Sequence, residues 1–146
     1  MSQENVEIVR SFSLGPDVDI APLFCDDERW ATAASLIAPL LHPDFECTAT
    51  LFGTETRSYG RGPEGFRAFW LDWTGPWATY RTERERITDL GDRVLDFGRE
   101  FGRREASTRE VKAFNAAVWT FRDGKVVGFD AYADRAGALK AVGLEA

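Results

Sequence analysis

The sequence predicts an α+β fold in a single domain spanning residues 1–146. Apolar residues recur with helical spacing in the first half of the chain, and from Thr79 onward they alternate with polar residues as they do in strands. Helices followed by a run of neighbouring strands are typical of α+β proteins. The length suits one hydrophobic core, and no repeat or linker interrupts the chain.

Two helices are expected before the first strand. The spacing of apolar residues predicts a helix over 2–14, which a Gly-Pro pair ends. Residues 15–27 are the least regular part of the chain, with room for one short helical turn. Asp26 or Asp27 can cap a second helix that runs to Leu41.

The first strand and a third helix follow. Apolar residues alternate with Glu and Thr over 45–51, which predicts a strand. Residues 52–62 contain three glycines and are expected to form a loop. Pro63 suits the first turn of a helix that runs to about Trp73, where a Gly-Pro pair stops it.

The second half of the chain is expected to form four antiparallel strands and a short helix. Asp123-Gly124 between two apolar runs is a strong hairpin signal, because the turn needs residues that tolerate positive φ. Asp134 resembles an N-cap for a C-terminal helix over 135–142. The four strands are expected at residues 79–89, 93–103, 110–121 and 125–133.

Composition excludes several classes of partner. The net charge is −6 and the pI is about 4.9, which argues against nucleic acid and anionic membranes. No apolar run is long enough to cross a membrane, and the polar first residues do not resemble a secretion signal. Cys25 and Cys47 lack metal-site spacing and are expected to be free thiols in a reducing, cytoplasmic compartment. Neither a metal nor a cofactor is expected.

Alternation along the predicted strands assigns one row of each to the core. On the strand from residue 93, the odd row over 95–101 is apolar except for Arg99, and on the next strand the odd row includes Asn115 and Trp119. Small alanines on these rows indicate either close helix packing or a cavity. In a cavity, Arg99 and Asn115 would be its polar anchors, although Arg99 could instead pair with Glu46 or Asp130. The segment 81–86, in which Arg and Glu alternate, is expected to be a solvated strand face.

Five motifs together resemble the SnoaL-like and ketosteroid isomerase-like branch of the nuclear transport factor 2-like superfamily. The resemblance implies a cone-shaped, strongly curved antiparallel sheet, a half-barrel wrapped around three helices with a hydrophobic pocket between them. It also implies a homodimer, which we expect to form through the outer face of the sheet. The motifs lie at residues 4–10, 41–46, 60–70, 118–127 and 132–134.

The acid–base residues implied by the resemblance are missing from their usual positions. The base position falls at about Cys47, and the acidic positions fall near Ala117 and Ala131. A register slip of one residue on the first strand would bring in Glu46. The catalytic candidates are therefore Glu46, Cys47 and Arg99, and His42, the only histidine, is expected to have a capping or surface role.

The first functional hypothesis is binding of a small hydrophobic molecule. The alternative is an isomerase, polyketide cyclase or hydrolase that acts in the same pocket, and a third is a subunit without a ligand. A carboxylate beside Arg99 in an open cavity would favour the enzyme. The expected ligand-binding residues are Tyr59, Trp70, Trp73, Arg99, Asn115, Trp119 and Phe129.

Overall fold

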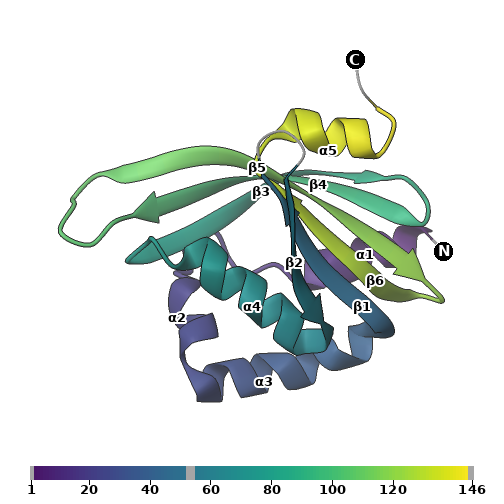
Figure 1. The fold of residues 1–146 in the computed structure, drawn as a ribbon, viewed down its shortest axis with the longest axis horizontal. Helices are drawn as coiled ribbons and strands as arrows, with labels where there is room; N and C mark the ends of the chain where they lie inside the picture. Colours follow the sequence, from purple (N-terminus) through teal and green to yellow (C-terminus); the bar gives the residue numbers. More distant parts are fainter. Residues whose placement is uncertain (1, 52–54, 145–146) are drawn as a thin grey trace.

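The fold is described from a computed structural model that covers residues 2–51 and 55–144 (Figure 1). Its helices are α1 (Ser2–Ser11), α2 (Ala21–Cys25), α3 (Asp27–Ile37), α4 (Gly62–Thr74) and α5 (Arg135–Ala141), and a 3₁₀ turn, η1 (Ala38–Leu40), follows α3. Its strands are β1 (Leu41–Thr50), β2 (Thr56–Arg61), β3 (Thr79–Asp89), β4 (Arg93–Arg103), β5 (Glu110–Arg122) and β6 (Lys125–Tyr132).

One six-stranded sheet organises the molecule, in the order β2-β1-β6-β5-β4-β3. All neighbouring strands are antiparallel except β1 and β6, which are parallel. Figure 1 shows the sheet curving over α2, α3 and α4, with α5 on its other face. The sheet does not close into a barrel, and register shifts in β1, β3 and β5 add to its curvature. The predicted α+β class and curved sheet are therefore confirmed.

Local signals placed most elements within a few residues of where the structure has them. Asp26 caps α3 by accepting a hydrogen bond from the Arg29 N–H at 3.0 Å, and Asp134 caps α5 through the Gly137 N–H at 2.7 Å. β3 and β4 have the predicted bounds. The first helix is shorter than predicted, because it ends at Ser11.

Three elements differ from the prediction. The irregular segment contains α2, so four helices rather than three precede β3 in the described part of the chain. β1 begins at Leu41, before the predicted start. Residues 56–61 of the expected loop form the edge strand β2, which is exposed and therefore lacks apolar alternation. Residues 52–54 of that loop lie outside the described residues.

The sheet is apolar on both faces. Aromatic residues of α4, β5 and β6 form the main core between the helices and the inner face. A smaller cluster on the outer face packs under Ala138 and Val142, at the C-terminal end of the chain, and comprises Leu95, Phe97, Ala116 and Val118. No helix of the described residues has the length and apolar character needed to cross a membrane.

The predicted inner row of β4 is wrong, and the sheet register gives the reason. Asp96 pairs with Ala117, so an even-numbered residue of β4 shares a face with an odd-numbered residue of β5. The inner residues of β4 are therefore Asp96, Gly98 and Glu100, whereas Arg99 lies on the outer face. Leu95 and Phe97 were equally misplaced, because an outer face covered by α5 is also apolar.

Candidate functional site

A cavity of about 690 Å³ lies between the inner face of the sheet and α1–α4. Small residues on three adjacent strands, Gly98, Ala117 and Ala131, form part of its wall on the sheet side, which we call the floor. Leu14 and Leu36 also line the cavity and are 44% and 71% exposed, so they mark its mouth. The aromatic residues around it are Phe12, Phe24, Trp30, Phe66, Phe69, Trp70, Trp73, Trp119 and Phe129.

An ion pair lies on the floor of this cavity. The Arg84 Nε donates to Asp96 Oδ1 at 2.9 Å and its Nη2 donates to Asp96 Oδ2 at 2.9 Å. Trp119 Nε1 donates to Oδ2 at 3.1 Å. The Asp96 side chain is only 13% exposed, and such two-pronged pairing fixes the direction of the carboxylate.

A second carboxylate lies on the same face of β4. One oxygen of Glu100, Oε2, accepts hydrogen bonds from Tyr80 Oη at 2.5 Å, Trp73 Nε1 at 3.1 Å and Asn115 Nδ2 at 2.9 Å. Burial, and next the negative charge of Glu100, hold the pKa of Tyr80 well above its usual value. Tyr80 therefore keeps its proton and remains a donor to Glu100.

Most of the expected ligand-binding residues line the cavity. Trp70, Trp73, Asn115, Trp119 and Phe129 do so. These positions follow from the predicted helix α4 and from the inner rows of β5 and β6, which alternation assigned correctly at these residues.

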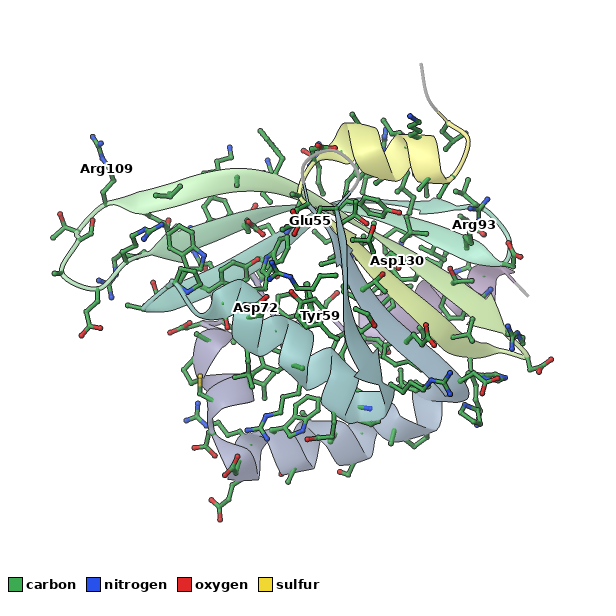
Figure 2. The ribbon with its side chains drawn as sticks, viewed as in Figure 1. Glu55, Tyr59, Asp72, Arg93, Arg109 and Asp130 are labelled. Atoms are coloured by element: carbon green, nitrogen blue, oxygen red, sulfur yellow. The ribbon has the colours of Figure 1, made fainter. Side chains whose placement is uncertain are left out.

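Tyr59 and Arg99 lie elsewhere. Figure 2 shows Tyr59 beside Asp72, and its hydroxyl donates to that carboxylate at 2.5 Å on the exposed side of β2 and α4. Arg99 Nη2 lies 3.3 Å from Glu83 Oε1 on the outer face of the sheet. The alternative of a structural ion pair for Arg99 therefore matches the geometry, with Glu83 rather than Glu46 or Asp130 as partner.

Glu46 and Cys47 are not placed in the cavity lining. Glu46 lies on the outer face, 3.3 Å from Arg61 Nη2. Cys47 is fully buried in the core, and burial, followed by the charge of Asp130, raises the pKa of its thiol far above the usual value. A thiol held protonated in this way is a poor nucleophile.

Cys25 is expected to react with a thiol reagent and Cys47 is not. Cys25 is exposed, whereas Cys47 is buried, and neither forms a disulfide. Titration of the native protein with Ellman's reagent at pH 8 should modify one thiol per chain quickly, and urea should release the second. The Cys25→Ser variant is the control and should show no fast reaction. Fast reaction of two thiols in the native protein would contradict the burial of Cys47.

The sequence analysis missed Arg84, Asp96 and Glu100. Arg84 was assigned to a solvated face, but it turns into the cavity opposite Gly98. A shift in register between Arg84 and Arg86 changes which β3 residues face inward, and single-strand alternation does not reveal such a shift. The glycine at position 98 was a usable signal for this polar site. A Cβ at that position would lie 2.9 Å from Asn115 Oδ1, so a larger residue would crowd the amide.

A polar trough lies on the outer face over β1, β6 and β5. Figure 2 shows Asp130 in this part of the sheet, and Thr48 donates a hydrogen bond to it. Desolvation, and to a smaller degree the nearby Glu46 charge, raises the pKa of Asp130, while the Thr48 hydrogen bond lowers it. Its ionised form is therefore disfavoured in the folded protein.

Replacing Asp130 with asparagine is expected to stabilise the protein at pH 7. The folded pKa lies above the unfolded value of ~3.9, so the folded state is favoured when Asp130 is protonated and loses that stability as pH rises through the folded pKa. Asparagine is neutral and still accepts from Thr48. Urea midpoints should be higher for Asp130→Asn at pH 7 and converge with wild type in acid.

The matched control for Asp130 is Asp44→Asn in the same trough, whose side chain is 62% exposed. It should leave the midpoint nearly unchanged at pH 7. A lower midpoint for Asp130→Asn at pH 7 would contradict the prediction.

Metal ligands do not gather in the described parts of the chain. No group of three or more His, Cys, Asp or Glu side chains over residues 2–51 and 55–144 is arranged to hold an ion. The polar groups of the cavity instead form neutral or ion-paired hydrogen-bond networks, which suit an organic ligand.

Comparison with solved structures gives the same fold at low sequence identity. A candidate SnoaL-like polyketide cyclase from Jannaschia sp. CCS1 is 19% identical with a TM-score of 0.60, over 96% of this chain and 92% of that one. TerC, co-crystallised with polyporic acid, is 19% identical with a TM-score of 0.58, over 96% and 98%. A Catenulispora acidiphila DSM 44928 protein with a ketosteroid isomerase-like fold, in complex with trimethylamine, is 14% identical with a TM-score of 0.57, over 94% and 93%.

The sequence itself assigns the family. No protein with a curated description matches the chain. The model of the SnoaL-like domain matches residues 24–129, which include α3, α4 and most of the sheet. Because that match covers well over half of the chain, the protein belongs to the SnoaL-like domain family.

Proposed function

We propose that this protein binds a small, mainly apolar molecule in the cavity beneath the sheet. The observation that carries the proposal is the cavity itself, whose volume of about 690 Å³ falls within the range of small-molecule sites. Aromatic rings surround it, and small residues at Gly98, Ala117 and Ala131 leave its floor flat. Burying an apolar ring system against such walls is favourable at roughly 25 cal/mol per Å².

Two similar structures carry a named ligand or activity of their own. TerC was crystallised with polyporic acid, and the Jannaschia protein is described as a candidate polyketide cyclase. At 19% identity these likenesses establish the fold alone, so the ligand class rests on the residues of this chain. Trp119 and Phe129 have ring centroids 4.6 Å apart at the floor, which provides an aromatic surface for stacking.

Enzymatic acid–base chemistry is the second candidate. An isomerase, cyclase or hydrolase needs a group that accepts a proton from the bound molecule or from a water. A carboxylate paired with an arginine does lie in the open cavity, but it is Asp96 beside Arg84 rather than a partner of Arg99. Asp96 therefore replaces Glu46 and Cys47 as the base in this proposal.

Binding can be tested with N-phenyl-1-naphthylamine, an uncharged probe that fluoresces in apolar sites. We expect saturable binding to the wild-type protein and at least a tenfold weaker affinity in Ala117→Trp, because the indole fills the cavity floor. Phe114→Trp is the matched control, since Phe114 is 52% exposed on the outer face. Equal binding by Ala117→Trp and wild type would contradict the proposed site.

Turnover distinguishes the two candidates. Compounds that bind are incubated with wild-type protein and with Asp96→Asn, and products are followed by mass spectrometry. Conversion that Asp96→Asn abolishes supports the enzyme, and binding without conversion supports a binding protein.

We also propose a homodimer formed through the outer sheet face, in a reducing compartment such as the cytoplasm. Phe114 is 52% exposed there, and Arg81 and Glu110 supply both signs of charge, as a self-complementary interface needs. Free Cys25 and Cys47 support the compartment. Light scattering should give twice the chain mass, and Phe114→Glu should give a monomer; a monomeric wild type at micromolar concentration would contradict the dimer.

A further inference from the structure

We infer that the cavity selects a ligand whose apolar body carries an uncharged hydroxyl group, and that it discriminates against carboxylates and against groups that only accept hydrogen bonds. This inference rests on the proposed binding function and adds the polarity of the ligand's polar group. The reason is that the unused polar atoms at the cavity floor are acceptors.

Asp96 provides the first acceptor. Each carboxylate oxygen can accept about two hydrogen bonds. Oδ2 has two donors, Arg84 Nη2 and Trp119 Nε1, whereas Oδ1 has one, Arg84 Nε. One acceptor position on Oδ1 is therefore left, on a carboxylate that lines the cavity.

Asn115 provides the second acceptor, and Glu100 sets its direction. A carboxylate only accepts, and Tyr80 keeps its proton, so Asn115 must turn its Nδ2 toward Glu100 Oε2, at 2.9 Å. The amide oxygen then lies over Gly98, 2.9 Å from where a Cβ would stand. Within the described residues, no donor forms a hydrogen bond with this oxygen.

Gly98 brings the two acceptors within reach of one ligand group. Gly98 pairs with Asn115 across β4 and β5, and Asp96 is the next inner residue of β4. Cross-strand and diagonal neighbours on one face lie about 5–8 Å apart, which a ligand hydroxyl and ring can span. A side chain at position 98 would fill the space between them.

Most N–H donors near this floor are already committed or point away, and the Thr82 hydroxyl, which lines the cavity, can accept as well as donate. Trp73 Nε1 and Trp119 Nε1 donate to Glu100 and Asp96. Arg84 binds Asp96 through its Nε and Nη2 N–H groups. On the opposite side of the guanidinium, Nη1 donates to Ser13 Oγ. Trp70 Nε1 has no partner, but it is buried from solvent.

The charges near the floor also favour a neutral ligand group over a carboxylate. Arg84 balances Asp96, whereas Glu100 forms no ion pair within residues 2–51 and 55–144 and is held by neutral donors. Glu100 is not in the cavity lining but contacts the lining residue Asn115, so it places an unbalanced negative charge close to the floor, where repulsion of a ligand carboxylate is less screened than in water. A neutral hydroxyl avoids this repulsion and donates its one hydrogen to either acceptor, Asp96 Oδ1 or Asn115 Oδ1.

A matched series of naphthalenes tests the inference. The ring is unsubstituted or carries a hydroxyl, methoxy or carboxylate group at the same position, and dissociation constants are measured at pH 7 by quenching of tryptophan fluorescence. We expect the hydroxyl compound to bind about tenfold more tightly than the parent ring, because it forms a hydrogen bond to a charged acceptor. The methoxy compound should gain nothing, and the carboxylate should bind more weakly than the parent.

Asn115→Leu checks that the preference comes from the proposed acceptors. It should lower the ratio of hydroxyl to parent affinity severalfold, a ratio that a general change of shape does not alter. Asp44→Asn, a substitution of a polar residue in the trough on the outer face, should leave the ratio unchanged.

The failures of the two proposals are distinguishable. If the parent ring binds but the hydroxyl gives no advantage, or if the carboxylate binds best, the inference on polarity is overturned and the binding function stands. If no member of the series binds and N-phenyl-1-naphthylamine does not bind either, the proposed function itself is overturned.

Discussion

Replacing Phe129 with alanine is expected to lower the free energy of unfolding by about 3–5 kcal/mol, the usual cost of truncating a buried aromatic side chain. Phe129 is 4% exposed and lies where the helices meet the sheet. Its ring centroid is 5.4 Å from those of Phe66 and Phe69 on α4 and 4.6 Å from that of Trp119 on β5. Truncation therefore removes contacts to two elements and enlarges an existing cavity, which neighbours cannot refill.

Leu71→Ala is the control for Phe129→Ala. It also truncates a large apolar side chain to alanine, on the helix α4 that Phe129 contacts, but Leu71 is 39% exposed. We expect it to cost less than about 1 kcal/mol. Urea unfolding followed by tryptophan fluorescence measures both, and similar losses for the two variants would contradict the assigned core.

The elements of the fold could be predicted where local chemistry determines them. Asp26 and Asp134 cap helices through their own side chains, and Asp123-Gly124 makes the turn of the last hairpin with positive φ at both residues. These signals act over a few residues and are visible in the sequence. β2 carries no such signal, because an exposed edge strand buries no alternate row.

The polar floor of the cavity could not be predicted from one strand at a time. The inner face of β4 is set by its register with β5, in which Asp96 pairs with Ala117. The apolar outer row, Leu95 and Phe97, then misled the assignment because α5 buries it. Trp119 and Phe129 were placed on the inner face correctly, because they share odd-numbered rows with Ala117 and Ala131. Polar residues that face inward break the alternation on which the prediction depends.

Replacing Asp96 with alanine is expected to destabilise the protein by about 2–4 kcal/mol, because it leaves the Arg84 guanidinium without its charge partner in a largely enclosed site. Arg84 is 24% exposed, so water offsets part of the loss. Asp72→Ala is the control. It also removes the partner of an arginine, but the Arg57 and Asp72 side chains are each 49% exposed. An exposed pair contributes about 0–1 kcal/mol.

The double variant Arg84→Met/Asp96→Leu separates the cost of an unpaired charge from the strength of the ion pair. If the loss in Asp96→Ala comes from an isolated guanidinium, removing both charges should recover much of the stability, since apolar groups of similar volume avoid the desolvation of either ion. Urea unfolding of wild type, Arg84→Met, Asp96→Leu and the double variant gives the coupling directly. A double variant less stable than Asp96→Ala would contradict this explanation and would show that the pair stabilises the fold itself. Recovered stability together with lost probe selectivity would instead show that Arg84 and Asp96 are retained for the ligand, at a cost to the fold.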